Sequence, residues 1–195
     1  MTYTFPMPGP EPEKNKPIQY TQPVPEIQGW IDPIEMNWLY GQASKMDSVV
    51  EIGCWKGRST HVLLSGCPGT VYAVDHFKGS PNERNGPHQD AVYNDIGSLF
   101  FKNVGYFENL VLLEMDSVKA ARKFKKLSVD MVWIDGGHDY DSIMADLKAW
   151  WPKCRKLLCG HDATQDGVPK ALAEMEPTIG KHQRAGAIWY IERSL

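Results

Sequence analysis

Residues 49–60, VVEIGCWKGRST, restrict the possible folds more than any other segment of the chain. A short β-branched run ends at Glu51, and Gly53 and Gly57 then bracket a tight turn before an expected helix. A second strand-like run ends at Asp75, close to the position, about 20 residues after the turn, where nucleotide-binding folds carry an acid. Strand, glycine turn, helix and second strand together predict a nucleotide-binding crevice.

The spacing of the glycines indicates which kind of nucleotide the crevice suits. Dinucleotide-binding folds carry G-x-G-x-x-G, whose glycines let the backbone close on a pyrophosphate. This chain instead has E-x-G-x-x-x-G-x-S, with Trp55 and Lys56 inside the turn. The wider turn suits a cofactor without phosphates, such as S-adenosylmethionine (SAM), and it disfavours a nicotinamide-dependent dehydrogenase.

Two segments resemble the cofactor motifs of class I SAM-dependent methyltransferases. Residues 49–60 are similar to the first motif, and VYAVDHF at 71–77 is similar to the second. The resemblance implies that Asp75 holds the ribose hydroxyls, and its carboxylate can accept two charge-assisted bonds from a vicinal diol. The alternative is a βαβ unit in which the glycines only turn the chain. The cofactor residues predicted in this way are Glu51, Gly53, Cys54, Trp55, Gly57, Ser59, Thr60, Asp75, His76, Asp116, Ser117 and Asp135.

Composition limits the class of protein and its partners. A chain of 195 residues, 42% hydrophobic and 23% charged, is typical of one soluble domain with its own core. The net charge of −3 argues against general affinity for nucleic acid, and no apolar run approaches the length of a membrane span. The first residues lack the apolar region of a signal peptide. We therefore expect a cytoplasmic protein with reduced thiols at Cys54, Cys67, Cys154 and Cys159.

The chain divides into a proline-rich arm, residues 1–28, and a methyltransferase domain, residues 29–195. The arm holds seven of the fourteen prolines, which favour extended structure over helix. One interpretation is an arm that is disordered or drapes over the surface. The other is an arm that packs over the active site or on a second subunit, which would make a homo-oligomer.

The body alternates between strand and helix signals. Asp32, Pro33 and Glu35 predict the start of a first helix, which then runs to about Lys45. The pattern that follows predicts an α/β fold with a doubly wound, mostly parallel sheet of six to seven strands and helices on both faces. The expected strands are 48–53, 70–75, 109–114, 129–135, 156–160 and 186–192, the last a candidate antiparallel strand, with 177–183 as a candidate seventh. The expected helices are 57–66, 89–104, 117–125, 140–150 and 167–175.

A second informative segment spans residues 129–162. One expected strand ends at Asp135, followed by His138, and the next ends at His161 and Asp162. Ligands of doubly wound sheets lie beyond the carboxyl ends of the strands, so these four side chains are expected to converge. Two carboxylates and an imidazole predict a metal site at Asp135, His161 and Asp162. The oxygens favour Mg²⁺, and the imidazole would also accept Mn²⁺, Fe²⁺ or Zn²⁺.

The same segment resembles the macrocin-type sugar O-methyltransferases and cephalosporin-hydroxylase-like proteins. In that branch an acid after the fourth strand and an acidic pair after the fifth hold Mg²⁺, which implies this role for Asp135 and Asp162. His161 replaces the first acid of the pair, leaving three alternatives: a weaker Mg²⁺ site, another metal or none. His138 matches the general base of the sugar-methylating members. In the simpler alternatives, His138 bonds to the backbone, His161 packs beside Asp162 and Asp135 caps a helix.

These observations predict a SAM-dependent O-methyltransferase that acts on a hydroxyl of a small molecule or sugar. Asp135 and His138 are the expected catalytic residues, assisted by a divalent metal. The alternatives are a SAM-binding protein without methyl transfer and a metal-dependent hydroxylase-like or hydrolase-like relative. The turn-rich loop 78–90, with Arg84 and His88, is a candidate lid or substrate loop. The sequence does not identify the methyl acceptor.

Overall fold

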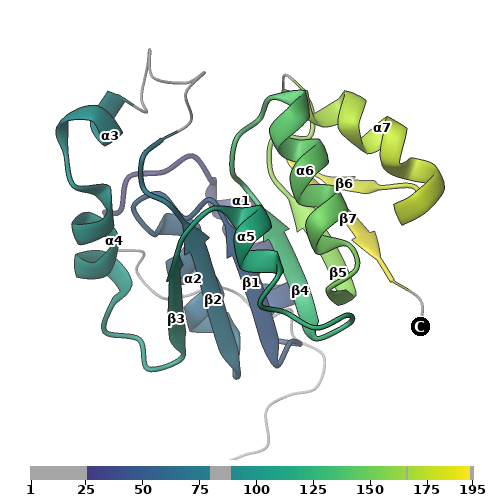
Figure 1. Cartoon of the computed structure of the whole chain (residues 1–195). Coiled ribbons are helices and arrows are strands. Elements are labelled where there is room, and N and C mark those ends of the chain that lie inside the picture. The colour runs from purple at the N-terminus through teal and green to yellow at the C-terminus, as the bar shows by residue number, and fades with distance from the viewer. Residues whose placement is uncertain (1–25, 80–88, 166, 194–195) are drawn as a thin grey trace, which may run out of the picture.

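The computed structural model describes residues 26–79, 89–165 and 167–193. In these segments seven strands form one sheet in the order β3-β2-β1-β4-β5-β7-β6 (Figure 1). The first five pair in parallel, whereas β7 is antiparallel to both β5 and β6. The strands are β1 (Ser48–Ile52), β2 (Thr70–Asp75), β3 (Leu110–Glu114), β4 (Val129–Ile134), β5 (Cys154–Gly160), β6 (Gln183–Ala185) and β7 (Ile188–Glu192). This sheet confirms the predicted doubly wound fold.

Helices cover both faces of the sheet, as Figure 1 shows. Helices α1, α2 and α4 contribute to the hydrophobic core on one face, and α5, α6 and α7 contribute to the core on the other. The helices are α1 (Pro33–Ala43), α2 (Arg58–Gly66), α3 (Asp90–Tyr93), α4 (Ile96–Val104), α5 (Ser117–Ala121), α6 (Tyr140–Trp150) and α7 (Val168–Ile179).

Helix α1 begins where the sequence predicts, with a complete capping box. The Asp32 carboxylate accepts from the main-chain N–H of Glu35, and the Glu35 carboxylate accepts from the N–H of Asp32. Pro33 occupies the first turn, where its missing N–H costs no hydrogen bond. The side chain of Glu35 is thereby directed back toward the start of the helix, where it is buried.

Several predicted element bounds are wrong. The expected helix 89–104 is two helices, because Asn94 is extended and the Asp95 carboxylate caps a new helix through the N–H of Ser98. Helix α5 ends at Ala121 rather than 125. Helix α7 continues through Pro177, so the expected seventh strand at 177–183 is wrong. The strand that completes the sheet of seven is β6 instead.

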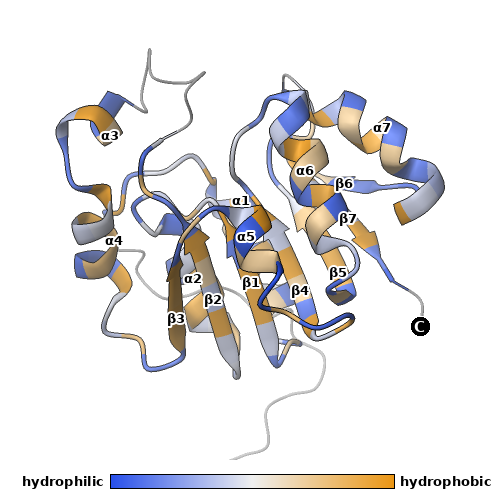
Figure 2. Ribbon diagram, in the orientation of Figure 1, coloured by the Kyte–Doolittle hydropathy of each residue, from blue (hydrophilic) through white to orange (hydrophobic). Residues whose placement is uncertain are grey.

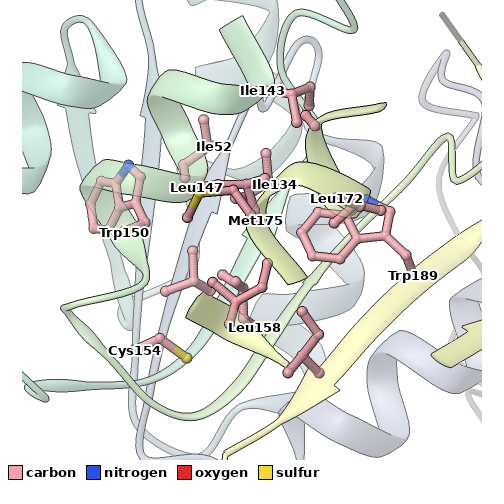
Figure 3. Packing of buried hydrophobic residues seen from close by; sticks show 14 of the residues in the cluster. Ile52, Ile134, Ile143, Leu147, Trp150, Cys154, Leu158, Leu172, Met175 and Trp189 are labelled. Atoms are coloured by element: carbon pink, nitrogen blue, oxygen red, sulfur yellow. The ribbon is translucent and has the colours of Figure 1, made fainter. Parts of the chain in front are cut away.

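The core lies on both sides of the central strands, where Figure 2 shows hydrophobic residues along the sheet. All six residues of β4 are buried. Figure 3 shows Trp150 and Trp189 on either side of Leu147 and Met175 in one of the two clusters. Each fully buried large apolar side chain stabilises the fold by about 1.5–3 kcal/mol. The strands are therefore held rigidly, and so are the residues at their ends.

Two predicted regions fall largely outside the described residues. These are the arm up to residue 25 and the loop 80–88, including Arg84 and His88. Ile27 is already buried against the body, two residues before the predicted start of the domain. None of the helices in the described segments has the length and apolar character that crossing a bilayer requires.

Candidate active site

A cavity of about 1130 Å³ opens at the carboxyl ends of the parallel strands. Its lining comes from the segments that follow β1, β2, β3, β4 and β5, and from residues 28–32 before α1. Strands that run parallel deliver their carboxyl ends to the same edge, which is where doubly wound folds bind ligands. The cavity therefore lies where the sequence predicts the crevice.

The glycine loop after β1 depends on residues with positive φ. Gly53 has φ +81° and Gly57 has φ +94°, and both values favour glycine because it has no β-carbon. A β-carbon on Gly53 would meet the main-chain carbonyl of Asp135 at 2.2 Å. Between the glycines, Trp55 has φ +47° and its ring lies 6.1 Å from that of Trp30. Trp55 of the loop and Trp30 of the segment before α1 thus form an aromatic pair beside the cavity.

Asp75 ties this loop to the end of β2. One carboxylate oxygen accepts from the N–H groups of Cys54 at 2.8 Å and Trp55 at 3.0 Å. The other accepts from the N–H of Phe77 at 2.7 Å. Asp75 and the neighbouring His76 line the cavity. Asp75 therefore positions the glycine loop, a role that the sequence did not suggest, and its ribose contact stays a prediction.

Three predicted cofactor residues do not line the cavity: Glu51, Gly57 and Thr60. The fully buried Glu51 lies beneath the start of α2 and accepts a hydrogen bond from the Ser59 hydroxyl. Burial raises the pKa of Glu51 to about 8, against the opposing effects of Ser59 and Thr60. These residues shape the loop from behind, whereas Gly53, Cys54, Trp55 and Ser59 face the cavity.

The segment after β3 contributes Asp116 and Ser117, both in the cavity lining. Asp116 also caps α5, since its carboxylate accepts from the N–H of Lys119 at 3.0 Å. The Ser117 hydroxyl donates to Asp146, a buried residue of α6. Burial raises the pKa of Asp146 to about 7, although the bond from Ser117 opposes this shift.

Asp146 was not among the predicted site residues. Its only sequence signal is helical register, because it follows Ile143 by three positions and precedes Trp150 by four. Residues at these spacings share one face of a helix, and here that face is buried. An acid on a buried helix face requires a partner or a ligand.

The residues that follow β4 and β5 meet, as predicted. Nδ1 of His161 lies 3.4 Å from an Asp162 carboxylate oxygen and 3.9 Å from an Asp135 oxygen. Nε2 of His138 lies 2.8 Å from the same Asp162 oxygen. Asp162 adopts φ +55°, an uncommon value for a residue with a side chain. The structure thus brings all four predicted residues into one cluster.

The charges of this cluster are strongly coupled. Burial raises the pKa of Asp135 to about 6, although His161 and His138 oppose the shift. Burial alone would lower the pKa of His161, but Asp162, Asp135 and Glu35 outweigh it and raise that pKa to about 9. Burial would raise the pKa of Asp162, yet its two histidine neighbours hold it well below its usual range. At neutral pH the cluster therefore contains both carboxylate and imidazolium groups.

Glu35 is a second residue that the sequence interpretation missed. Its Oε2 lies 3.1 Å from Nε2 of His161, and its Oε1 accepts from the N–H of Ala187 at 2.9 Å. The capping box alone accounts for a glutamate at position 35, so the sequence does not indicate a further contact for this side chain. Glu35 connects the start of α1 to the cluster.

The donor atoms of Asp135, His161 and Asp162 suit a divalent cation. One atom from each residue lies within 4.8 Å of the others. Two carboxylate oxygens and one imidazole nitrogen are ligands that divalent ions accept. The chemistry of these donors therefore fits the predicted metal.

The comparisons with known proteins agree with this fold. A family model described as a methyltransferase domain matches residues 50–162. No curated protein matches the chain.

Three similar solved structures show the same fold. An O-methyltransferase from Bacillus cereus in complex with SAH has a TM-score of 0.58 at 16% identity, over 87% of this chain and 84% of that one. The SAH-bound methyltransferase PaMTH1 of Podospora anserina has a TM-score of 0.60 at 12% identity, over 85% and 80%. CalS11, a TDP-rhamnose 3′-O-methyltransferase of calicheamicin biosynthesis, has a TM-score of 0.54 at 17% identity, over 80% and 76%.

The matched residues include the glycine loop, Asp75, and the ends of β4 and β5, so the family match and the cavity concern the same part of the molecule. The chain belongs to the methyltransferase domain family and has the class I SAM-dependent methyltransferase fold.

Proposed function

We propose that this protein transfers a methyl group from SAM to a hydroxyl of a small molecule or sugar. The single observation that carries this proposal is the convergence of the glycine loop and the Asp135, His138, His161 and Asp162 cluster on one cavity. One part of that cavity suits the cofactor, and the other offers groups that can take a proton. Similar folds in the Bacillus and Podospora proteins carry SAH, which supports the choice of cofactor.

The cofactor side of the cavity is formed by the segments after β1, β2 and β3. SAM supplies an activated methyl group on its sulfonium sulfur. Gly53 lets the loop approach the end of β4, and Asp75 and Asp116 present acidic side chains along the lining. These acids suit the hydroxyl and amino donors of an adenosine group.

The acceptor side contains His138 and Asp162. A hydroxyl is a poor nucleophile at neutral pH, so a base in contact with it accelerates transfer. We assign this base to the imidazole of His138, and Asp162 orients the ring and stabilises the imidazolium that forms. A divalent cation held by Asp135, His161 and Asp162 would lower the pKa of the hydroxyl.

The nearby indole rings favour a ring-shaped acceptor. Trp30 and Trp55 both line the cavity, and about half of the Trp30 side chain is exposed. Aromatic faces pack well against the apolar face of a sugar or another small ring. CalS11 methylates a sugar, TDP-rhamnose, and its similar fold is in keeping with this acceptor class.

Titration calorimetry with SAM, together with transfer of a labelled methyl group to a panel of hydroxylated compounds, tests the proposal. We expect micromolar SAM binding that Asp75→Ala removes. We expect His138→Asn to retain SAM binding and to slow transfer by about 10²-fold or more. His182→Asn is the matched control, since His182 lies outside the cavity lining, and it should behave as the wild type.

Three results would contradict the proposal. An absence of SAM binding in the folded wild-type protein would remove the cofactor assignment. Normal transfer in His138→Asn would remove the base assignment. SAM binding without transfer to any hydroxylated compound would favour a binding protein over an enzyme.

A further inference from the structure

His161 lies between two sets of carboxylates and faces each through a different ring nitrogen. Nε2 lies 3.1 Å from an oxygen of Glu35. Nδ1 faces Asp162 at 3.4 Å and Asp135 at 3.9 Å. The side chains of His161 and Glu35 are only 9% and 8% exposed, so water does not compete strongly for these contacts.

Glu35 is itself held firmly from both sides. The N–H of Ala187 donates to Oε1 at 2.9 Å, and the N–H of Asp32 donates to Oε2 at 3.2 Å. Gly186 packs so closely that a β-carbon there would lie 3.1 Å from Oε1. A fixed carboxylate beside Nε2 keeps a proton on that nitrogen and fixes the orientation of the ring.

This arrangement directs Nδ1 toward the two acids as a potential ligand. A cation that enters displaces any proton from Nδ1, because a metal requires the lone pair. Metal–ligand distances of about 2.1 Å place tetrahedral neighbours about 3.4 Å apart and octahedral neighbours about 3.0 Å apart. The 3.4 Å separation equals the tetrahedral value, whereas the 3.9 Å separation would have to contract by about 0.5–0.9 Å.

We propose that Glu35 and His161 make this a site for a divalent transition metal such as Mn²⁺, in preference to Mg²⁺. Mn²⁺ accepts an imidazole nitrogen beside carboxylate oxygens, whereas Mg²⁺ prefers oxygen ligands and keeps its waters. Glu35 acts as a positioning residue, because it holds the ligand without touching the ion. The inference deepens the proposed function and rests on it for the use of the metal in methyl transfer.

The test measures metal binding by the full chain without SAM. Calorimetry with Mn²⁺ and with Mg²⁺ gives the ratio of the two affinities. We expect Mn²⁺ to bind at least tenfold more tightly than Mg²⁺ in the wild type. His161→Asp should bring this ratio down by about tenfold or more, because it replaces the nitrogen with oxygen. His182→Asp, the matched control, should leave the ratio unchanged.

A spectroscopic readout identifies the ligand atom directly. Pulsed electron paramagnetic resonance of bound Mn²⁺ should show ¹⁴N coupling from imidazole in the wild type and none in His161→Asp. Glu35→Gln should weaken Mn²⁺ binding by about 10- to 100-fold, the usual effect of losing a partner of a metal-bound histidine. Circular dichroism checks that this variant folds, since Glu35 is also part of the capping box.

Failure of this inference is distinct from failure of the proposed function. Equal affinity for the two ions, no metal binding, an unchanged ratio in His161→Asp, or absence of ¹⁴N coupling would each overturn the metal preference. None of these results bears on SAM affinity, which is titrated separately without metal. Conversely, tight nitrogen-ligated Mn²⁺ in a protein that does not bind SAM would support the site and remove the methyltransferase assignment.

Discussion

Gly53 faces the main-chain carbonyl of Asp135 so closely that no side chain fits between the two backbones. A β-carbon at position 53 would lie 2.2 Å from that oxygen. The N–H of Asp135 also donates to the carbonyl of Ile52 at 2.8 Å. The glycine loop and the segment that carries Asp135 and His138 are thus in direct backbone contact. A change in one will displace the other.

Gly53→Ala should therefore disrupt both parts of the site. The clash is with backbone, which cannot rotate away, and the φ of +81° is strained for alanine. We expect destabilisation by about 2–4 kcal/mol and loss of SAM binding. Gly41→Ala is the control, since a β-carbon there meets nothing within 4 Å and helix α1 favours alanine. Denaturation and calorimetry that gave equal results for both variants would contradict the close-approach argument.

Glu51 should make stability depend on pH. Its pKa is about 8 in the folded protein and near 4.5 when exposed, so the folded state binds more protons between these values. The contribution of Glu51 to the free energy of unfolding is therefore greatest below about pH 4.5, and it falls as the pH rises toward 8. The amide of Glu51→Gln does not ionise, so the variant does not lose stability in this way. Its free energy of unfolding relative to that of the wild type should therefore increase by roughly 3 kcal/mol from pH 5 to 8.

Urea denaturation at several pH values measures the effect of Glu51. The control is Glu108→Gln, which replaces an exposed acid of the same type. It should retain the wild-type dependence on pH. Parallel stability curves for the wild type and Glu51→Gln would show that burial does not shift this carboxyl.

Ser117 should matter more for stability than a similar serine at the surface. Ser117→Ala leaves the buried Asp146 without its hydroxyl donor, and an unsatisfied buried group costs about 1–3 kcal/mol. Ser98→Ala is the matched control. The Ser98 hydroxyl of the wild type donates to the exposed Asp95, and its loss should change stability by less than about 0.5 kcal/mol. Thermal denaturation distinguishes the two. Equal shifts would mean that Asp146 has another donor.

Arg58 should hold the segment before α1 against the cavity. Its Nε and Nη1 donate to the main-chain carbonyls of Ile31 at 3.2 Å and Ile27 at 2.9 Å. Arg58→Ala removes both bonds, and amide hydrogen exchange of residues 27–31 should accelerate about tenfold or more. Arg58→Lys should restore only part of the protection from exchange, because one ammonium group cannot reproduce the planar fork of the guanidinium. Unchanged exchange would show that other contacts hold the segment.

The sequence predicted those site residues whose position depends only on the sheet. Asp75, Asp135, His161 and Asp162 end parallel strands, and such ends meet at one edge whatever the details of packing. Glu35 and Asp146 depend on helix packing instead. Glu35 meets a residue 126 positions away, and no local pattern encodes such a contact.

The errors in the helices have a similar origin. The break at Asn94 and Asp95 follows from a cap that competes with a continuous helix, and both outcomes fit the hydrophobic pattern. The motif predicts a cofactor role for Glu51. The structure places it behind the loop, since the start of α2 covers that end of β1.

The contacts of Glu35 also set the order in which a nascent chain can complete the site. The Oε1 partner of Glu35, the N–H of Ala187, follows Glu35 along the chain by 152 positions. At about 5–20 residues per second, synthesis of that stretch takes roughly 8 to 30 s. During this interval the glycine loop can form with β1 and β2, whereas the Glu35 carboxylate lacks its Ala187 donor. The carboxylate that faces His161 is therefore fully fixed only after the segment around Ala187 has been made.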